Sequence, residues 1–237
     1  MNKTIHTVFD KDHFFHLSDM IIDAYENDEL ILVVVHGKQG YGKSTYASIT
    51  MSQVYGYFNN NMDDVDVYHY DWKTTRDYFI FRPHEFLTLS RKQKDKAPVC
   101  CVDDAGMWLN SMDFNDPLVK AVGKFLEVSR TKWACILFTC SDLNQVFSKI
   151  RNMPHVYTIR ITKHGATDES PNRRIATIYE GWRSEDLKKS GRKTKYIDII
   201  NNCHMPDDFY KWYKPKRDAL ADQGLNELEE QLKKLGF

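Results

Sequence analysis

The glycines and the lysine in the stretch HGKQGYGKST, residues 36–45, have a spacing that suits phosphate binding. Gly37, Gly40 and Gly42 have no side chain, so the backbone can turn its N–H groups inward and form a concave nest of donors. Lys43 follows at once and is in position to reach the β- and γ-phosphates of a nucleotide. The next segment has the composition of a helix, and a helix N-terminus favours anions. We therefore expect a phosphate-binding loop.

The whole stretch fits the pattern G-x-x-x-x-G-K-[ST] of P-loop nucleoside triphosphatases. The apolar run LILVVVH at residues 30–36 comes directly before it, as a buried strand would. In this pattern the hydroxyl of Ser44 ligates Mg²⁺, and we expect Thr45 to face the α-phosphate. The loop predicts ATP and Mg²⁺ as ligands, and the alternative is a glycine-rich turn that binds nothing.

Two carboxylates end a second apolar run, VCCVDDAG at residues 99–106. We expect Asp103 to hold Mg²⁺, through water or through Ser44, and Asp104 to polarise the attacking water. Most ATPases of this kind have glutamate at the second position, and aspartate is shorter. The alternative is that Asp104 only caps a helix or forms a turn.

A third apolar run, ACILFTCS at residues 134–141, ends in candidates for contact with the γ-phosphate. Thr139 or Ser141 could serve in this way, and the alternative is that Ser141 and Asp142 cap the following helix.

Two arginines are candidates for the guanidinium that stabilises charge during phosphoryl transfer. Arg130 ends the helix predicted before this third strand, and Arg151 ends the helix predicted after it. The alternative for each is a helix C-terminal cap.

Strands and helices alternate over most of the first two thirds of the chain, which predicts a three-layer α/β fold with a mostly parallel central sheet. We expect an N-terminal helical extension at residues 1–27 and an ATPase core at 28–155. A β-hairpin should extend the core at 156–183. A basic linker and a C-terminal helix, interrupted by Gly224, should occupy 184–237.

The composition gives no global sign of a partner, because 33 Lys and Arg balance 33 Asp and Glu. The N-terminus lacks the apolar core of a signal peptide, and the apolar runs are strand-sized, so we expect a cytoplasmic protein without membrane segments. Most of the five cysteines lie in apolar runs, which favours reduced thiols over disulfides.

Basic residues gather in the C-terminal third, close to aromatic residues such as Trp182 and Trp212. The basic residues are Lys149, Arg151, Arg160, Lys163, Arg173, Arg174, Lys188, Lys189, Arg192, Lys193 and Lys195. Such segments can follow a phosphate backbone and stack on bases, so we expect contact with DNA. The alternative is an ordinary solvated surface.

The order GKQGYGKST, VCCVDDAGMWL, ILFTCSDLNQVFSKIRN resembles the ASCE group of P-loop ATPases over roughly residues 28–160. The DDAG motif and Arg151 are similar to the DnaA/DnaC type of AAA+ ATPase. The small size, the hairpin and Arg130 resemble the FtsK/HerA-like ATPases that pump DNA. The resemblance implies a third strand lying between the loop strand and the acid strand. A hairpin stands where AAA+ proteins have a helical lid. The chain also resembles ATPases of archaeal viruses or plasmids.

These features together predict an ATP-hydrolysing enzyme that acts on DNA as a homo-oligomer, in replication initiation, helicase loading, translocation or packaging. One alternative is a nucleotide kinase-like phosphotransferase, with the segment KKSGRKTK at residues 188–195 as its lid. The other is a protein that binds nucleotide without hydrolysis and uses its C-terminal helix as a partner site.

Overall fold

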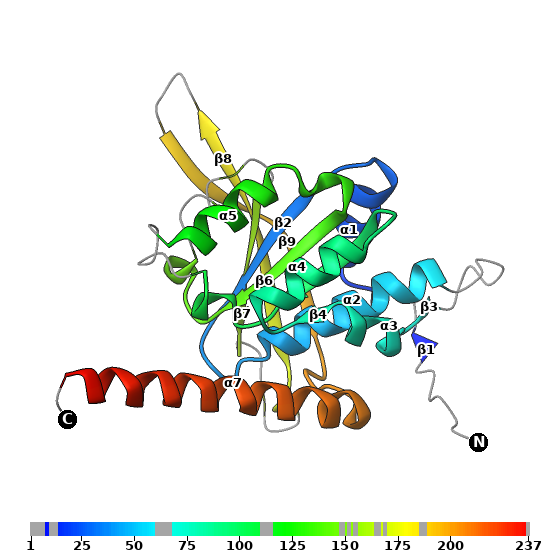
Figure 1. The fold of residues 1–237 in the computed structure, drawn as a ribbon. Helices are drawn as coiled ribbons and strands as arrows, with labels where there is room; N and C mark the ends of the chain where they lie inside the picture. Colours follow the sequence, from blue (N-terminus) through cyan, green and yellow to red (C-terminus); the bar gives the residue numbers. More distant parts are fainter. Residues whose placement is uncertain are drawn as a thin grey trace. The chain divides into compact units, whose positions relative to one another are not determined.

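A seven-stranded sheet with the strand order β4-β5-β6-β2-β7-β8-β9 forms the centre of the computed structural model (Figure 1). The five strands from β4 to β7 run parallel, and β8 and β9 continue the sheet in antiparallel fashion. The strands are β2 (Ile31–His36), β4 (Phe79–Ile80), β5 (Ala97–Val102), β6 (Trp133–Cys140), β7 (Val156–Thr162), β8 (Arg174–Ser184) and β9 (Lys189–Ile200). The structure describes residues 8–9, 14–59, 68–109, 116–146, 150, 153, 156–163, 167, 170–184 and 189–235.

Helices cover both faces of the sheet, so the fold has the three layers that the sequence predicts. One face carries α1 (His16–Glu26) and α2 (Lys43–Asn59), which pack on each other and on β5 and β6. The other carries α4 (Pro83–Lys92) and α5 (Pro117–Leu126). The short α3 (Trp72–Asp77) packs against α2. The predicted fold class, α/β with a mostly parallel sheet, is confirmed.

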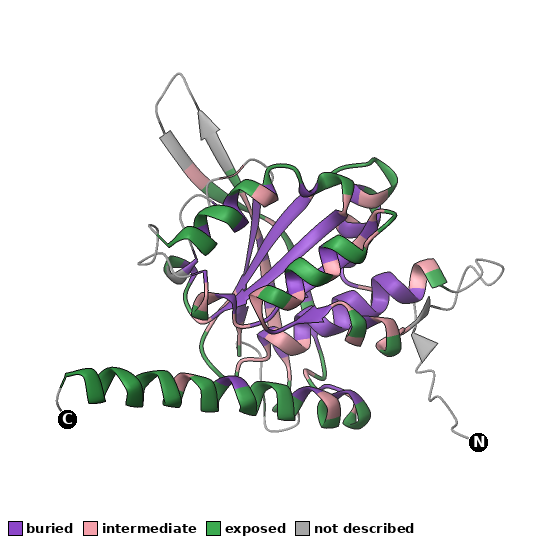
Figure 2. Cartoon of the chain, viewed as in Figure 1, coloured by how far each residue is buried: buried purple, intermediate pink, exposed green. Residues whose placement is uncertain are grey.

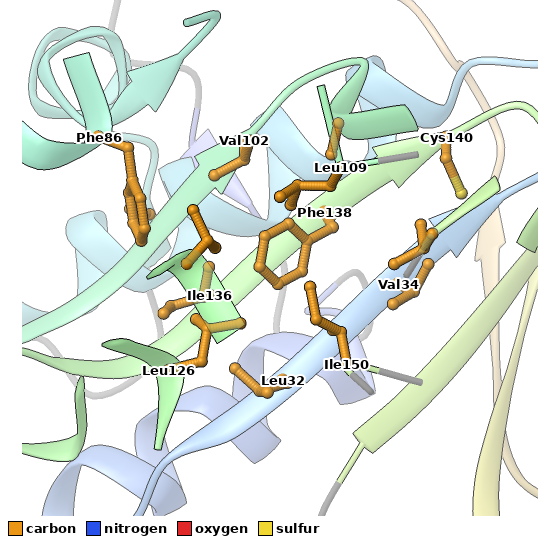
Figure 3. Packing of buried hydrophobic residues seen from close by; sticks show 14 of the residues in the cluster. Leu32, Val34, Phe86, Val102, Leu109, Leu126, Ile136, Phe138, Cys140 and Ile150 are labelled. Atoms are coloured by element: carbon orange, nitrogen blue, oxygen red, sulfur yellow. The ribbon is translucent and has the colours of Figure 1, made fainter. Parts of the chain in front are cut away.

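The core explains why the central strands are apolar without interruption. Successive side chains of a strand point to opposite faces, and both faces are covered here. Leu32 of β2 and Phe138 of β6 join a buried cluster with Phe86 of α4 and Leu126 of α5 (Figure 3). Strand β6 is therefore buried along its whole length, and β2 is buried except at His36, its last residue (Figure 2).

The strand order brings the chemically important strand ends together. β6 lies between β2 and β5 and is parallel to both, which is the order that the resemblance to ASCE ATPases implies. The carboxyl ends of parallel strands meet at one edge of a sheet, and ligands of open α/β sheets bind outside that edge. The loop after β2, the acids after β5 and the polar end of β6 therefore share one edge.

The predicted hairpin is present, but the predicted linker after it is wrong. β7 and β8 pair in antiparallel fashion, and residues 189–200 form strand β9, paired along the length of β8. The run of basic residues at 188–195 suggested a linker, but an edge strand such as β9 tolerates charged side chains. Asp198 of β9 accepts hydrogen bonds from the Tyr46 hydroxyl (2.5 Å) and the His16 N–H (2.8 Å), which tie β9 to α2 and α1. Burial raises the pKa of this carboxyl, while those hydrogen bonds oppose the rise.

Two smaller parts complete the description. β1 (Val8–Phe9) and β3 (Tyr68–His69) form a separate two-stranded sheet.

Residues 205–237 form a second compact unit, which consists mainly of α7 (Asp207–Lys234). The expected interruption at Gly224 is wrong, because a glycine inside a helix costs only about 1 kcal/mol and α7 runs on through it. Within the described residues, every helix is too short or too polar to cross a membrane.

Candidate nucleotide-binding site

The loop after β2 needs glycine at two positions for reasons of space. All three loop glycines have positive φ angles: 149° at Gly37, 73° at Gly40 and 88° at Gly42. A β-carbon at Gly37 would lie 2.7 Å from the carbonyl oxygen of Ile161 in β7, and one at Gly42 would lie 2.2 Å from the Cys203 Sγ. The loop is therefore held between the ends of β7 and β9, in a conformation that disfavours other residues.

Lys43, the lysine of the loop, is buried. α2 begins at Lys43, and its first turn contains no acidic residue of its own. The Lys43 side chain is only 7% exposed, and its Nζ donates to the carbonyl oxygen of Lys38 at 3.2 Å. The ammonium group thus lies under the loop, where it can meet phosphate oxygens.

Three polar side chains meet at the end of β5. Asp103 is 1% exposed, and its Oδ1 accepts hydrogen bonds from the hydroxyls of Ser44 (2.7 Å) and Thr139 (2.6 Å). A hydroxyl beside a carboxylate is the donor set that a Mg²⁺ ion shares with phosphate oxygens and water. Within the described part of the chain, no group of three or more His, Cys, Asp and Glu side chains could hold a metal ion by itself. The pair Ser44 and Asp103 fits an ion that arrives with a nucleotide.

Asp104 has an unusual backbone conformation, with φ 48° and ψ 39°. Residues other than glycine rarely adopt this left-handed region, and such strain gathers at functional sites. The Asp104 N–H donates to the Thr139 Oγ1 at 2.8 Å, and its side chain is half-buried. The catalytic role of Asp104 stays a prediction.

The two candidates at the end of β6 differ in what they contact. The Thr139 hydroxyl donates to Asp103 and accepts from the Asp104 N–H, so it positions the two acids. Ser141 instead lines an open hollow beside the loop. Asp142 caps the turn that follows, since its Oδ1 accepts from the Asn144 N–H at 2.9 Å. Of the two, Ser141 is the one that can face a ligand.

This hollow has a volume of about 620 Å³ and lies at the ends of β2, β6 and β7. Its lining residues are His36, Gly37, Lys38, Tyr41, Ser141, Asp142, Arg160, Ile161, Thr162 and Lys163. Burial lowers the pKa of His36 to about 4, helped by the guanidinium groups of Arg192 and Arg160 and by Lys43, against the opposing charge of Asp142. Lys163 lies over the Tyr41 ring, 5.2 Å from its centre. The hollow is therefore lined by three cations, Lys38, Arg160 and Lys163, and by one anion, Asp142.

A second wall of the loop comes from residues 171–174 and 202–204, which we call the hairpin wall. The two segments are joined by a hydrogen bond from the Cys203 N–H to the Asn172 carbonyl at 3.0 Å. The Cys203 thiol lies 3.7 Å from the Gly42 carbonyl oxygen, to which it donates. The hairpin wall thus touches the phosphate-binding loop directly.

The structure describes one of the two predicted arginines. Arg130 lies before β6, at the amino ends of the strands, where its Nη1 donates to Asp28 at 3.1 Å. It is not brought to the site within one chain. Arg151 lies outside the described residues. Its role stays a prediction.

Sequence reasoning missed two contributions to the site. Arg160 and Lys163 were assigned to a nucleic-acid surface, yet both line the hollow beside the loop. The signal was present, because both residues lie at the carboxyl end of a strand parallel to β2, where strand ends converge. Cys203 carried no such signal, since only the pairing of β9 brings it to Gly42.

Comparisons with known proteins find similarity to viral proteins. No known protein-family model matches it. It is 25% identical over 221 residues to the uncharacterized protein B-251 of Sulfolobus spindle-shape virus 1, across 91% of this chain and 85% of that protein. It is 24% identical over 203 residues to the uncharacterized protein ORF286 of Acidianus two-tailed virus, across 82% of this chain and 64% of that protein. Both relatives are viral, which supports the expected viral origin.

Two solved structures are similar at a lower level. The N-terminal domain of zonular occludens toxin from Neisseria meningitidis has a TM-score of 0.41 and 11% identity, across 77% of this chain and 97% of that one. The genome packaging NTPase B204 from Sulfolobus turreted icosahedral virus 2, in complex with ATP-gammaS, has a TM-score of 0.37 and 9% identity, across 70% of this chain and 97% of that one. The fold and site described above rest on this chain's own geometry.

Proposed function

We propose that this protein is a P-loop ATPase that binds ATP with Mg²⁺ and hydrolyses it. The observation that carries the proposal is the 2.7 Å hydrogen bond between the Ser44 hydroxyl and Asp103, directly beside a glycine loop with three positive φ angles. Ser44 and Asp103 are 59 residues apart in the chain, so only the fold brings this pair together. A chance glycine-rich turn would have no reason to meet a buried acid at a strand end.

Each residue of the site has a distinct task in this proposal. Ser44 and Asp103 would hold the Mg²⁺ ion, which neutralises charge on the phosphates when bound. Lys43 contacts the β- and γ-phosphates. Asp104 orients the attacking water, and Thr139 keeps both acids in place through its two hydrogen bonds.

We also propose that hydrolysis serves work on DNA by an oligomer of this chain. The support is the concentration of cations beside the loop: Arg160 and Arg192 are exposed, and both guanidinium groups act on His36 at the end of β2. Exposed guanidinium groups favour the phosphate backbone of a nucleic acid. A DNA phosphate bound there would lie next to the loop that senses the nucleotide.

The two other predicted functions have less support. The phosphotransferase alternative needs a lid, but residues 189–195 of the segment proposed for it are part of strand β9. Binding without hydrolysis would require Asp104 to be inactive, and its strained backbone beside Thr139 favours a functional role instead.

The test is steady-state ATP hydrolysis by the wild type, Lys43→Ala and the control Lys94→Ala, each alone and with single- or double-stranded DNA. Lys94 is exposed at the opposite edge of the sheet, so its loss should leave hydrolysis unchanged. We expect hydrolysis to vanish only in Lys43→Ala and to rise with DNA. Nucleotide binding without turnover on any DNA would refute the ATPase proposal, and turnover that DNA does not change would refute the proposed work on DNA.

A further inference from the structure

The hairpin wall contains a buried cation that the predicted site does not use. Arg174 is the first residue of β8 and is only 7% exposed. Alternation along β8 puts it on the same face as Ala176, which is fully buried. The cross-strand partner of Ala176 is Asp198, whose carboxylate meets Tyr46 of α2. Arg174 therefore lies on the face of the sheet that α2 covers.

The hydrogen bonds of Arg174 leave its charge uncompensated. Its Nη1 donates to the carbonyl oxygens of Pro171 and Arg173, each at 2.8 Å. Its Nε is buried and has no hydrogen-bond partner. None of the ion pairs among the described residues includes Arg174. A buried cation that is bonded only to neutral carbonyl groups is destabilising, so a bound anion is the expected complement.

The start of α2 faces the same space. Burial raises the pKa of the Cys203 thiol to about 11, and the charge of Arg174 opposes that rise, as does a hydrogen bond with the Thr45 side chain. Cys203 links the two parts by geometry as well: its N–H donates to the Asn172 carbonyl oxygen of the hairpin wall, and its thiol donates to the Gly42 carbonyl oxygen just before α2. A helix N-terminus and a guanidinium group both attract negative charge. An anion bound beside Cys203 would interact with both.

We propose that Arg174 binds the α-phosphate of the nucleotide and that the hairpin wall closes the nucleoside end of the site. The inference rests on the proposed nucleotide binding. In that proposal Lys43 contacts the β- and γ-phosphates, so the α-phosphate, next to Thr45, is the one left for Arg174. The hairpin wall then takes the place of a helical lid. The ligand is a nucleoside diphosphate or triphosphate. Arg174 should contribute equally to the binding of both, because both contain an α-phosphate.

The first experiment measures the affinities of MgATP and MgADP for the wild type and Arg174→Gln by calorimetry. We expect both nucleotides to bind roughly tenfold or more weakly to Arg174→Gln, since charge-assisted hydrogen bonds are lost. The ratio of the two affinities should stay constant, because both nucleotides have an α-phosphate. Unchanged affinities would overturn the inference, and so would a loss for MgATP alone, which would point to the γ-phosphate.

The matched control is Arg91→Gln, which removes the same charge from an exposed residue of α4, away from the hairpin wall. We expect it to bind both nucleotides as the wild type does. An equal loss in Arg91→Gln would mean that only the net positive charge matters, which would overturn a specific contact by Arg174.

A second experiment takes its decisive readout from the wild type, so it does not depend on the folding of Arg174→Gln. The thiols of Cys100, Cys101, Cys135 and Cys140 are at most 1% exposed and that of Cys203 is partly exposed, so an alkylating reagent at alkaline pH should modify Cys203 first in the folded protein. We expect saturating MgADP to slow this modification in the wild type and to have no effect in Lys43→Ala. If MgADP left the rate of Cys203 alkylation in the wild type unchanged, the proposed contact between the nucleotide and the hairpin wall would be overturned.

The outcomes separate the inference from the function on which it rests. If the wild type binds no nucleotide, the proposed function fails. If the wild type binds MgADP and Lys43→Ala does not, but Arg174→Gln binds as the wild type does, the proposed function stands and only the inference about Arg174 fails.

Discussion

The two edges of the central sheet use charged residues in opposite ways. At the amino edge, Asp28 forms ion pairs with Lys96 (2.9 Å) and Arg130 (3.1 Å), and the carboxylate is well exposed. At the carboxyl edge, Lys43, Asp103 and Arg174 are each at least nine-tenths buried. Exposed ion pairs contribute little to stability and are screened by salt. Buried charges are costly, so a chain that keeps them has another use for them.

The backbone follows the same division. Asp104 and the loop glycines, all at the carboxyl edge, account for four of the five positive φ angles in the described residues. Asp28 is the fifth, and it follows the C-terminal end of α1, where such a conformation is common. Positive φ angles and buried charge therefore both concentrate at the carboxyl edge, where we propose that the nucleotide binds.

The largest expected effect comes from exchanging one aspartate at each edge for asparagine. Asp103→Asn should lower ATP hydrolysis by roughly 100-fold or more, the upper end for groups that hold or orient a metal ion. Asp28→Asn should leave hydrolysis unchanged, because it removes only an exposed ion-pair partner. Comparable losses in steady-state rates of the two variants would contradict the functional difference between the edges.

A smaller effect concerns His36 and the pH dependence of stability. Its pKa falls from 6.5 to about 4 on folding, so between these values the unfolded chain binds a proton that the folded chain does not. Stability should therefore fall as the pH falls through this window. His36→Gln removes this contribution, and its free energy of unfolding should decline less than that of the wild type over the same window. Parallel curves from urea titrations at a series of pH values would contradict this.

The smallest expected effect is that of Arg130→Gln. Arg130 is 60% exposed and pairs with Asp28 at the amino edge, so we expect hydrolysis to stay at the wild-type rate with and without DNA. A finger arginine is worth roughly 10³–10⁵ in rate. A loss of that size would show that Arg130 reaches the site of a neighbouring copy, and the functional division between the edges would not hold in the assembly.

Much of the carboxyl edge could be predicted from the sequence because its residues belong to short, local patterns. Gly37 to Ser44 form the loop by their own order, and Asp103 follows directly from an apolar strand. The hairpin of β7 and β8 was likewise predictable from alternation. Strand β9 was not, because its charged first half obscured the pattern that its pairing with β8 makes clear.

The sequence by itself determined the phosphate-binding pattern of the loop, since the glycines, a lysine and a hydroxyl stand in fixed order within one short segment. Only the tertiary structure decided what surrounds that loop. Arg160, Arg174 and Cys203 lie more than a hundred residues beyond the loop, and sheet pairing alone brings them to it. The same pairing carried Arg130 to the opposite edge. Distance along the chain does not limit such contacts, because parallel strands align their ends however far apart they are in sequence.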